Sequence, residues 1–441
     1  MISPITQDST SRTQGKRLLL FVLGSLLVAN VVQWAVCRSL HLGNPGNMKG
    51  SLQAFAHMTQ GTDSWLPMMK SLDYFHANPT MPIYAAHLYD TLIYSLASLL
   101  PLVFLRKLGV GDVTMLRLLA LTSWLAVVGV AVISIAMGRR LLRQRGAKMP
   151  WTAAVAVVLA CLGCYPLLKG YALGNAQTLL SFGFALMLYL WTAGREREAG
   201  VVCALLAFVK PQYGLLLVWM ALRRKWGALW AFVICSVVLL ALAVAVFRWR
   251  NNLDYIGVLA SLSHKAQSHF ANQSMFGTLN RMIFNGENLG YTPHVYTPYV
   301  AWVYRTTVIT SLVLAGGVLL FPWGRLRGST ADIAAMGLAS VAASPMAWEH
   351  HYGIVFGIFA WFWFAYGCWQ PKAPWLWGLA FFLCDNFLGA TNLLSNVRGW
   401  NILQSYIYFG ALLLLFLLMR LARRVSNDPA VELSPGYGAA V

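Results

Sequence analysis

Asp63 is the first residue of the chain whose type and surroundings could do chemistry. It stands in the stretch Gly61-Thr62-Asp63-Ser64-Trp65, early in a long segment between two apolar runs. A carboxylate in this setting can act as a general base and accept the proton of an attacking hydroxyl. The structural alternative for Asp63 is a helix cap or a solvated loop carboxylate. Asp73, in the same segment, is better explained by a structural hydrogen bond.

Three titratable residues, Glu349, His350 and His351, follow one another at the end of an apolar stretch. They could bind a phosphate or orient a base, because imidazole changes its charge near neutral pH. Adjacent residues on a helix point about 100° apart and so rarely share one metal ion. We expect no metal site here, and the structural alternative is a polar cluster at a membrane interface.

Lys210 stands inside an apolar segment, directly before Pro211. An ionisable side chain at membrane depth is costly, and it marks a functional site by default. Its ammonium group could neutralise a lipid phosphate. Snorkelling to the interface, or a buried ion pair with a residue such as Asp385, is the alternative.

Two polar stretches carry side-chain amides. Asn175 and Gln177, in Gly174-Asn175-Ala176-Gln177, could bind sugar hydroxyls, although the same stretch is compatible with an ordinary turn. Asn272 and Gln273 form a second polar patch. Arg281 follows that patch and suits a phosphate, because a guanidinium makes paired hydrogen bonds to oxyanions.

The elements that must position these residues are membrane helices. Of the 441 residues, 58% are hydrophobic and 11% charged, whereas soluble domains carry roughly 25% charged residues. Several apolar runs approach or exceed the ~20 residues that cross a bilayer core. The clearest are 18–37, 114–138, 228–247, 301–320, 352–368 and 402–419. We therefore expect an all-α polytopic membrane protein.

The net charge of +19 does not indicate a nucleic-acid partner. The basic residues form short clusters between apolar runs, at 139–148, 223–225, 325–327 and 420–424. This is the pattern of cytoplasmic loops in membrane proteins, and no basic soluble domain is left to hold a nucleic acid. The sequence also has no glycine-rich phosphate loop. We expect neither a nucleic-acid partner nor a cofactor.

The basic clusters also orient the chain. They predict a cytoplasmic tail at 1–17, one transmembrane domain at 18–425 with about 10 full spans, and a disordered cytoplasmic tail at 426–441. The segments 38–112 and 248–300 then lie outside. All nine histidines fall on the outer side, so the titratable chemistry gathers on that face.

Two segments do not fit a simple alternation of spans. The apolar segment 91–108 is predicted to lie at the outer interface, because a crossing there would reverse the orientation of the basic cluster that follows. The segment 199–222 has inside-type charges at both ends and so must cross an even number of times. Two half-helices that meet at Lys210 and Pro211 satisfy this requirement, and such broken helices occur where backbone lines a polar cavity.

Taken together in their order, these stretches resemble the polyprenyl-phosphate-dependent glycosyltransferases of family 87, which have the GT-C fold. The resemblance covers about residues 18–420. It rests on five stretches, namely Asp63-Ser64-Trp65, Gly174-Asn175-Ala176-Gln177, Val209-Lys210-Pro211, Asn272-Gln273-Ser274 with Asn280-Arg281, and Ser344-Pro345-Met346-Ala347-Trp348-Glu349-His350-His351-Tyr352.

The resemblance implies a GT-C-like helix bundle and an inverting glycosyl transfer without a cofactor. The donor would be a mannose-like hexose or a pentose on a polyprenyl phosphate, and the acceptor a glycolipid or glycan outside a bacterial cytoplasmic membrane. The family's first-loop carboxylate acts as the base, which points to Asp63. The candidates that stabilise the departing phosphate are Lys210, Arg281, His350 and His351.

Two other functions remain open on the sequence alone. A secondary transporter or lipid-linked sugar flippase would suit a broken helix with a lysine at depth, but the chain has no detectable repeat and its titratable groups gather on one face. An outer-face polysaccharide ligase or polymerase would need a large arginine-rich outer loop. The second outer segment holds only Arg248, Arg250 and Arg281.

Overall fold

The computed structural model describes residues 4–39, 48–79, 81–84, 92–265, 267–292, 295–367 and 374–427. Within these ranges the regular structure is helical, apart from one isolated β-bridge. The α-helices are α1 Pro4–Ser39, α2 Met48–Ala56, α3 Trp65–Ala77, α4 Leu100–Lys107, α5 Asp112–Gln144, α6 Trp151–Gly163, α7 Tyr165–Leu173, α8 Gln177–Thr192, α9 Glu196–Val209, α10 Leu215–Leu222, α11 Trp226–His264, α12 Met275–Met282, α13 Ala301–Leu320, α14 Thr330–Ala342, α15 Val355–Phe362, α16 Pro374–Asp385 and α17 Tyr406–Asn427. The short 3₁₀ helices used below are η1 Leu96–Leu99, η2 Pro211–Gly214, η4 Glu349–Ile354, η6 Gly389–Leu394 and η7 Trp400–Ser405.

The predicted all-α polytopic membrane class is confirmed. Five helices in the described part of the chain are long and apolar enough to cross a membrane, namely α1, α5, α11, α13 and α17 with η7. The pair α6 and α7, bent by 50°, would make a sixth. Other apolar helices, such as α8 and α14, are shorter than the ~20 residues that a full span needs. The figure of about 10 spans therefore stays a prediction.

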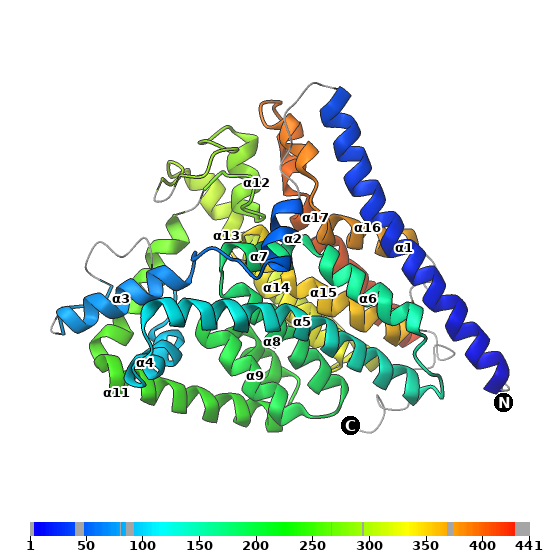
Figure 1. The fold of residues 1–441 in the computed structure, drawn as a ribbon, viewed down its shortest axis with the longest axis horizontal. Coiled ribbons are helices and arrows are strands. Elements are labelled where there is room, and N and C mark those ends of the chain that lie inside the picture. Colours follow the sequence, from blue (N-terminus) through cyan, green and yellow to red (C-terminus); the bar gives the residue numbers. More distant parts are fainter. Residues whose placement is uncertain are drawn as a thin grey trace.

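The core is built from short helices enclosed by long ones. All residues of α14 and α15 are buried. The long helices instead expose apolar side chains, such as Leu20 (69% exposed) on α1 and Leu320 (82%) on α13. In Figure 1, α1 runs along the right-hand edge and α11 along the lower left, with α14 and α15 between them. Apolar side chains exposed in this way suit contact with lipid rather than water.

Both irregular segments take the expected form. The helix break lies at Lys210, whose backbone is extended between α9 and η2 (φ −132°, ψ 106°). The described part of segment 91–108 forms only η1 and α4, which together are too short to span a bilayer. The second predicted outer segment starts at Arg248, where a positive φ of 66° kinks α11. Of the two predicted tails, the first is helical from Pro4, and 428–441 lie outside the described residues.

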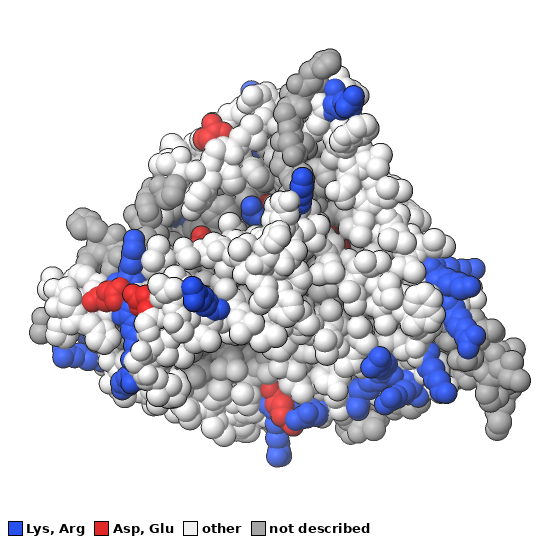
Figure 2. Space-filling model, viewed as in Figure 1, with Lys and Arg blue, Asp and Glu red and all other residues white. Residues whose placement is uncertain are grey.

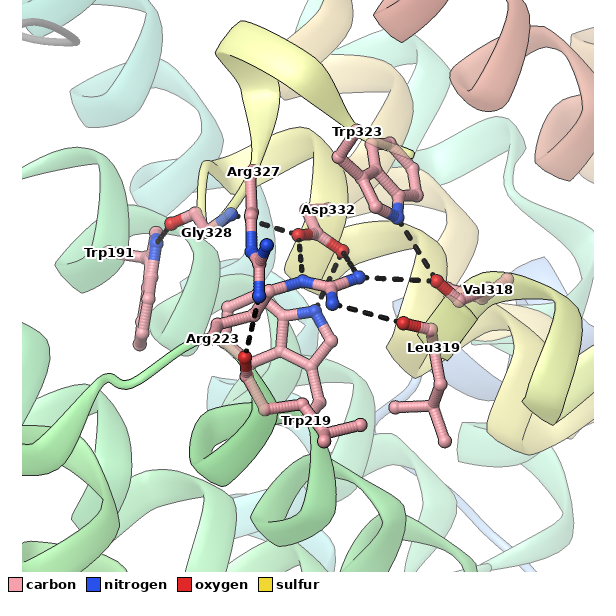
Figure 3. Close-up of polar contacts among 10 residues, drawn as sticks. Trp191, Trp219, Arg223, Val318, Leu319, Trp323, Arg327, Gly328 and Asp332 are labelled. Atoms are coloured by element: carbon pink, nitrogen blue, oxygen red, sulfur yellow. Dashed lines mark hydrogen bonds and ion pairs between the residues drawn. The ribbon is translucent and has the colours of Figure 1, made fainter. Parts of the chain in front are cut away.

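A buried ion pair, here called the Arg223–Asp332 clamp, joins the ends of three helices (Figure 3). Asp332 in the first turn of α14 accepts hydrogen bonds from Arg223 Nε (2.6 Å), Trp219 Nε1 (2.7 Å) and the Gly328 amide (2.9 Å). The Arg223 guanidinium also donates to two carbonyls at the end of α13, at 3.0 and 3.3 Å. The clamp fixes α10, α13 and α14 to one another, and these helices carry residues of the site described next.

Candidate active site

Asp63 is held against the loop between α7 and α8. Three backbone amides of 61–64 donate to the carbonyls of 172–174, at 2.8, 3.0 and 3.1 Å. The Asn175 side chain then donates from Nδ2 to Asp63 Oδ2 at 2.5 Å, and Asn175 Oδ1 accepts from the Gln177 amide at 2.8 Å. The Asp63 side chain is otherwise exposed. Two stretches that are far apart in sequence thus form one unit, in which Asn175 orients a carboxylate that remains open to solvent.

Gly174 makes this approach possible. It ends α7 in the left-handed conformation (φ 67°), which favours glycine. A Cβ at Gly174 would lie 1.9 Å from the carbonyl oxygen of Gly61. The chain therefore needs glycine at position 174 for two reasons, one conformational and one steric, and the result is the close contact that sets Asp63 beside Asn175.

Two tyrosines, Tyr84 and Tyr94, support the unit formed by the Asp63 loop and the Asn175 loop. The Ser64 hydroxyl lies 2.7 Å from the Tyr94 hydroxyl and accepts from the Ala176 amide at 3.0 Å. Tyr84 donates to the Tyr94 carbonyl at 2.7 Å. Ser64, Tyr84 and Tyr94 are all buried. A buried and connected network of this kind limits the movement of the loop that carries Asp63.

The second pair of predicted stretches also meets. Residues 271–274 lie antiparallel to residues 345–349. The Gln273 amide donates to the Ala347 carbonyl at 2.7 Å, and the Glu349 amide donates to the Ala271 carbonyl at 2.8 Å. The second outer segment is thereby fixed directly to the stretch that carries the two histidines.

The Gln273 and Asn272 side chains serve this packing. Gln273 Nε2 donates to the Gln404 carbonyl at 2.7 Å, and Gln273 Oε1 accepts from the Ile407 amide at 3.1 Å. Asn272 Nδ2 donates to the Gln267 carbonyl at 2.9 Å. Both side-chain amides are fully buried and form hydrogen bonds to other groups of the protein. Their geometry therefore gives them a structural role.

Arg281 also lies inside the packed outer segment. Its side chain is 0% exposed. Nη1 donates to the carbonyls of His269 (2.9 Å) and Asn272 (3.0 Å), and Nη2 contacts the Ser405 hydroxyl. Nη1 and Nη2 are therefore bonded to the protein's own acceptors, while Nε has no hydrogen-bond partner in the described part of the chain. The guanidinium does not line the cavity described below, and the predicted phosphate contact has no geometric basis there.

Glu349, His350 and His351 form η4 before α15, outside the long spanning helices, and all three are buried. Glu349 Oε1 accepts from the Tyr165 hydroxyl at 2.6 Å. Burial raises the pKa of Glu349, and Lys169 opposes this effect. Burial, with nearby Lys210, holds the pKa of both histidines well below the usual range. At neutral pH the imidazoles are uncharged and act as hydrogen-bonding groups rather than as cations.

Lys210 and His351 lie on the wall of a cavity of about 450 Å³. Lys210 is buried, and its Nζ atom has no hydrogen-bond partner in the described part of the chain. The neighbouring charge that acts on it is that of Asp63, so the predicted alternative of a pair with Asp385 is not what the structure contains. Tyr94 also lines this cavity and links it to the Asp63 loop through Ser64.

The rest of the cavity wall is mainly apolar. It includes Leu259 and Leu262 of α11, and Leu312 and Ala315 of α13. Leu312 and Ala315 belong to the candidate membrane span α13, whereas Leu259 and Leu262 lie beyond the kink at Arg248, in the part of α11 that is predicted to lie outside. The cavity thus joins a polar end, which holds Lys210 and His351, to an apolar end between α11 and α13.

Several residues of this region were not singled out from the sequence. Tyr94 and Trp348 line the cavity, Lys169 acts electrostatically on Glu349 and His350, and Tyr291 is in electrostatic range of Asp63. The only signal for Lys169 and Trp348 was their place beside the polar stretches. Figure 2 shows this face hollowed beneath the part that holds α12, with acidic and basic side chains visible in the hollow.

Comparison with known proteins gives one positive result. Residues 92–348 match the model of glycosyltransferase family 87, a span of more than half of the chain. The match includes Asn175 and Lys210, whereas Asp63 lies before its start and the two histidines lie just after its end. No curated protein matches, and no solved structure matches. On this family match the chain belongs to glycosyltransferase family 87.

Proposed function

We propose that this membrane glycosyltransferase moves a mannose-like hexose or a pentose from a polyprenyl-phosphate donor to a hydroxyl of a glycolipid or glycan, with inversion at the anomeric carbon. The observation that carries the proposal is the cavity. Its polar end holds Lys210 and His351 and is linked to the Asp63 loop, and its apolar end lies between α11 and α13. A lipid-linked donor has these two chemistries in one molecule.

In this proposal Asp63 is the general base. Its carboxylate is exposed and is oriented by Asn175, at 2.5 Å, so it can approach an acceptor hydroxyl that arrives from the aqueous side. Orientation by a fixed donor favours one carboxylate oxygen for proton transfer. Asn175 is then a positioning residue, and Gln177 contributes the backbone amide that fixes Asn175.

Lys210 is proposed to bind the donor phosphate. An unpaired, buried ammonium group is unfavourable unless an anion compensates for its charge, and a phosphate supplies that anion. His351 lines the same cavity and would donate a hydrogen bond as a neutral imidazole. Since charge grows on the phosphate as the glycosidic bond breaks, fixed groups around it stabilise the transition state.

The reaction then balances without any further group. The acceptor oxygen attacks the anomeric carbon, while its proton passes to Asp63. The bond between the anomeric carbon and the phosphate oxygen breaks, and the electron pair leaves on the phosphate. The products are a glycosylated acceptor and a polyprenyl phosphate. A phosphate monoester is stable as an anion and needs no acid of its own, so one carboxylate suffices.

The orientation in the membrane is part of the proposal. The basic clusters of the inner loops would face the cytoplasm of a bacterial cell, and the Asp63 loop would face the exterior or periplasm. One described cluster is at the end of α5, which holds Arg139, Arg140 and Arg143. In Figure 2 a dense group of Lys and Arg lies at the lower right, where Figure 1 places the ends of α5 and α1.

The direct test is transfer by the purified full-length protein in proteoliposomes. Polyprenyl phosphates that carry radiolabelled mannose, glucose or arabinose would be offered with glycolipid and glycan acceptors. We expect one donor to be consumed, with a product of opposite anomeric configuration. If wild-type protein consumes none of them but moves the labelled lipid between leaflets, the enzyme proposal is wrong and a flippase is the better description.

Replacement of Lys210 with methionine should lower the turnover number for transfer by about 10²–10³-fold, the effect of losing one group that stabilises developing charge. Methionine keeps much of the side-chain volume in the buried site while removing the charge. The measurement is kcat and the donor KM, determined separately at saturating acceptor. The greater loss should appear in kcat, because the phosphate gains charge in the transition state.

Lys107→Met is the matched control for this test. Lys107 is an exposed lysine of α4, and its replacement should leave both constants unchanged. A Lys210→Met protein that is folded and as active as wild type would show that the phosphate is held elsewhere. His350 and His351 would then be the next residues to replace.

A further inference from the structure

Three aromatic side chains pack together at the outer edge of the candidate site. The rings of Tyr291 and Trp348 meet edge to face, with centroids 5.8 Å apart. His269 lies against both, at 5.7 Å from Tyr291 and 6.2 Å from Trp348. These three residues are called the outer aromatic cluster below. Edge-to-face packing at these distances is favourable, and it fixes the orientation of each ring.

The cluster adjoins the proposed donor cavity through Trp348. Trp348 lines the cavity that holds Lys210 and His351. Burial, and to a smaller extent the charge of Asp63, raise the pKa of Tyr291. Tyr291 packs on Trp348, the residue of the cavity wall, so an acceptor that reaches a donor in the cavity can contact the Tyr291 ring.

Tyr291 is 55% exposed although its ring is held in place. The loop before it is fixed by hydrogen bonds. The Glu287 carboxylate accepts from two backbone amides, at 2.7 and 3.2 Å, and the Glu287 carbonyl accepts from the Ser268 hydroxyl at 2.7 Å. Asn288 donates to the Ser395 carbonyl at 2.9 Å. An exposed ring on an ordered loop is preorganised for binding, because little conformational freedom is lost when a ligand arrives.

The chemistry of an exposed aromatic ring beside a carboxylate suits a sugar. The C–H face of a pyranose or furanose ring carries partial positive charge and packs on the negative face of an aromatic ring, while its hydroxyls reach polar neighbours. A lipid tail would instead need apolar neighbours. The neighbours of Tyr291 include the polar residues Asp63, His269 and Glu287. A tyrosine of a membrane-interface belt would also be exposed, but a belt position would not require it to lie near the site.

We propose that the outer aromatic cluster is the acceptor subsite, and that Tyr291 stacks on the acceptor sugar ring that carries the attacking hydroxyl. The acceptor is then recognised through a sugar residue, whether that residue belongs to a glycolipid or to a free glycan. This inference rests on the proposed function for the identity of the reaction, and it adds the residue that determines acceptor binding.

The first test is kinetic and compares Tyr291→Ala, Tyr291→Phe and Tyr299→Ala. Tyr299 is the matched control, because it is 57% exposed and belongs to the same outer segment, where it packs on His264 and Tyr304. Tyr291→Ala should raise the acceptor KM at least tenfold and leave the donor KM unchanged. Tyr291→Phe keeps the ring that stacks on the sugar and should stay within about threefold of wild type. Tyr299→Ala should behave as wild type.

The second test needs no turnover, so it separates this inference from the proposed function. Binding of methyl glycosides of mannose, glucose, galactose and arabinose to the detergent-solubilised protein would be followed by saturation-transfer NMR. At least one glycoside should bind wild type, Tyr291→Phe and Tyr299→Ala, and lose its signal with Tyr291→Ala. Equal binding by Tyr291→Ala, or binding of no glycoside by wild type, would overturn the subsite. Binding as expected without transfer would keep the subsite and reject the proposed reaction.

Discussion

Asp63→Asn should abolish most of the transfer activity and leave the protein folded. The expected fall in kcat is about 10²–10⁴-fold, the usual contribution of a positioned general base. The acceptor and donor KM values should change little, because the amide occupies the same space as the carboxylate. The measurement is initial transfer rate in proteoliposomes, alongside thermal unfolding in detergent.

The structural reason for expecting a folded variant lies in the contacts of Asp63. The loop is held by backbone bonds from 61–64 to 172–174, and asparagine keeps all of them. The oxygen of the new amide can still accept from Asn175 Nδ2, which now reaches Asp63 Oδ2 at 2.5 Å. What is lost is the basic lone pair, so a fall in rate with an unchanged unfolding midpoint identifies a chemical role.

Asp73→Asn is the control for the base. Asp73 forms a surface ion pair with Arg106 at 2.6 Å, with its side chain 58% exposed, and exposed pairs contribute little to stability. Its replacement should leave the transfer rate unchanged. If Asp73→Asn is inactive while Asp63→Asn is active, the assignment of the base is wrong, although membership of the family is not affected.

The sequence was a good guide to the membrane class and to the position of the broken helix. Composition and apolar run length predicted the membrane class. The inside-type charges at both ends of 199–222 predicted the break at Lys210. These features are local, and local physics is enough to predict them. The contact between Asp63 and Asn175 is different. It depends on a backbone approach that only Gly174 allows, and no spacing in the sequence encodes a contact over that separation.

The same limit explains why side-chain roles were harder to predict than positions. Arg281 and Asn272 are residue types that suit ligands, and the structure buries both among backbone carbonyls. Residue type cannot distinguish a phosphate oxygen from a carbonyl oxygen, because both accept the same hydrogen bonds. Tyr291 and Trp348, by contrast, belong to a large set of aromatic residues. Only their contacts in the structure distinguish them from the aromatic residues that are expected at a membrane interface.

Asp332→Asn is the second variant for which we expect a large effect, and the effect is on stability. Loss of one partner of a buried ion pair typically costs about 3–5 kcal/mol. Here both side chains are almost fully buried, Arg223 at 5% and Asp332 at 0% exposure. The asparagine would keep one oxygen as an acceptor, but it would leave the guanidinium of Arg223 without a counter-charge. The measurement is unfolding of the purified protein in detergent, followed by circular dichroism or thermal shift.

The double variant Arg223→Met with Asp332→Leu separates the charge pair from its packing. Replacement of a buried ion pair by apolar residues of similar volume is often close to neutral. The double variant should therefore be more stable than Asp332→Asn alone. Glu198→Gln is the control, because the Arg195–Glu198 pair is exposed on both sides (57% and 48%), and it should leave the unfolding midpoint unchanged.

The clamp also tests whether the site depends on the helix ends that the clamp joins, which are the predicted inner ends. Asp332 contacts α10 through Trp219 and Arg223, and Gly328 in turn accepts from Trp191 of α8 at 3.1 Å (Figure 3). Gln177 begins α8, Lys210 lies just before η2 and α10, and α10, α13 and α14 each contribute residues to the cavity wall. If the clamp only stabilises the fold, Asp332→Asn should keep the wild-type kcat in its folded fraction at low temperature. A kcat that falls while the protein is still folded would instead show that the inner ends set the geometry around Lys210.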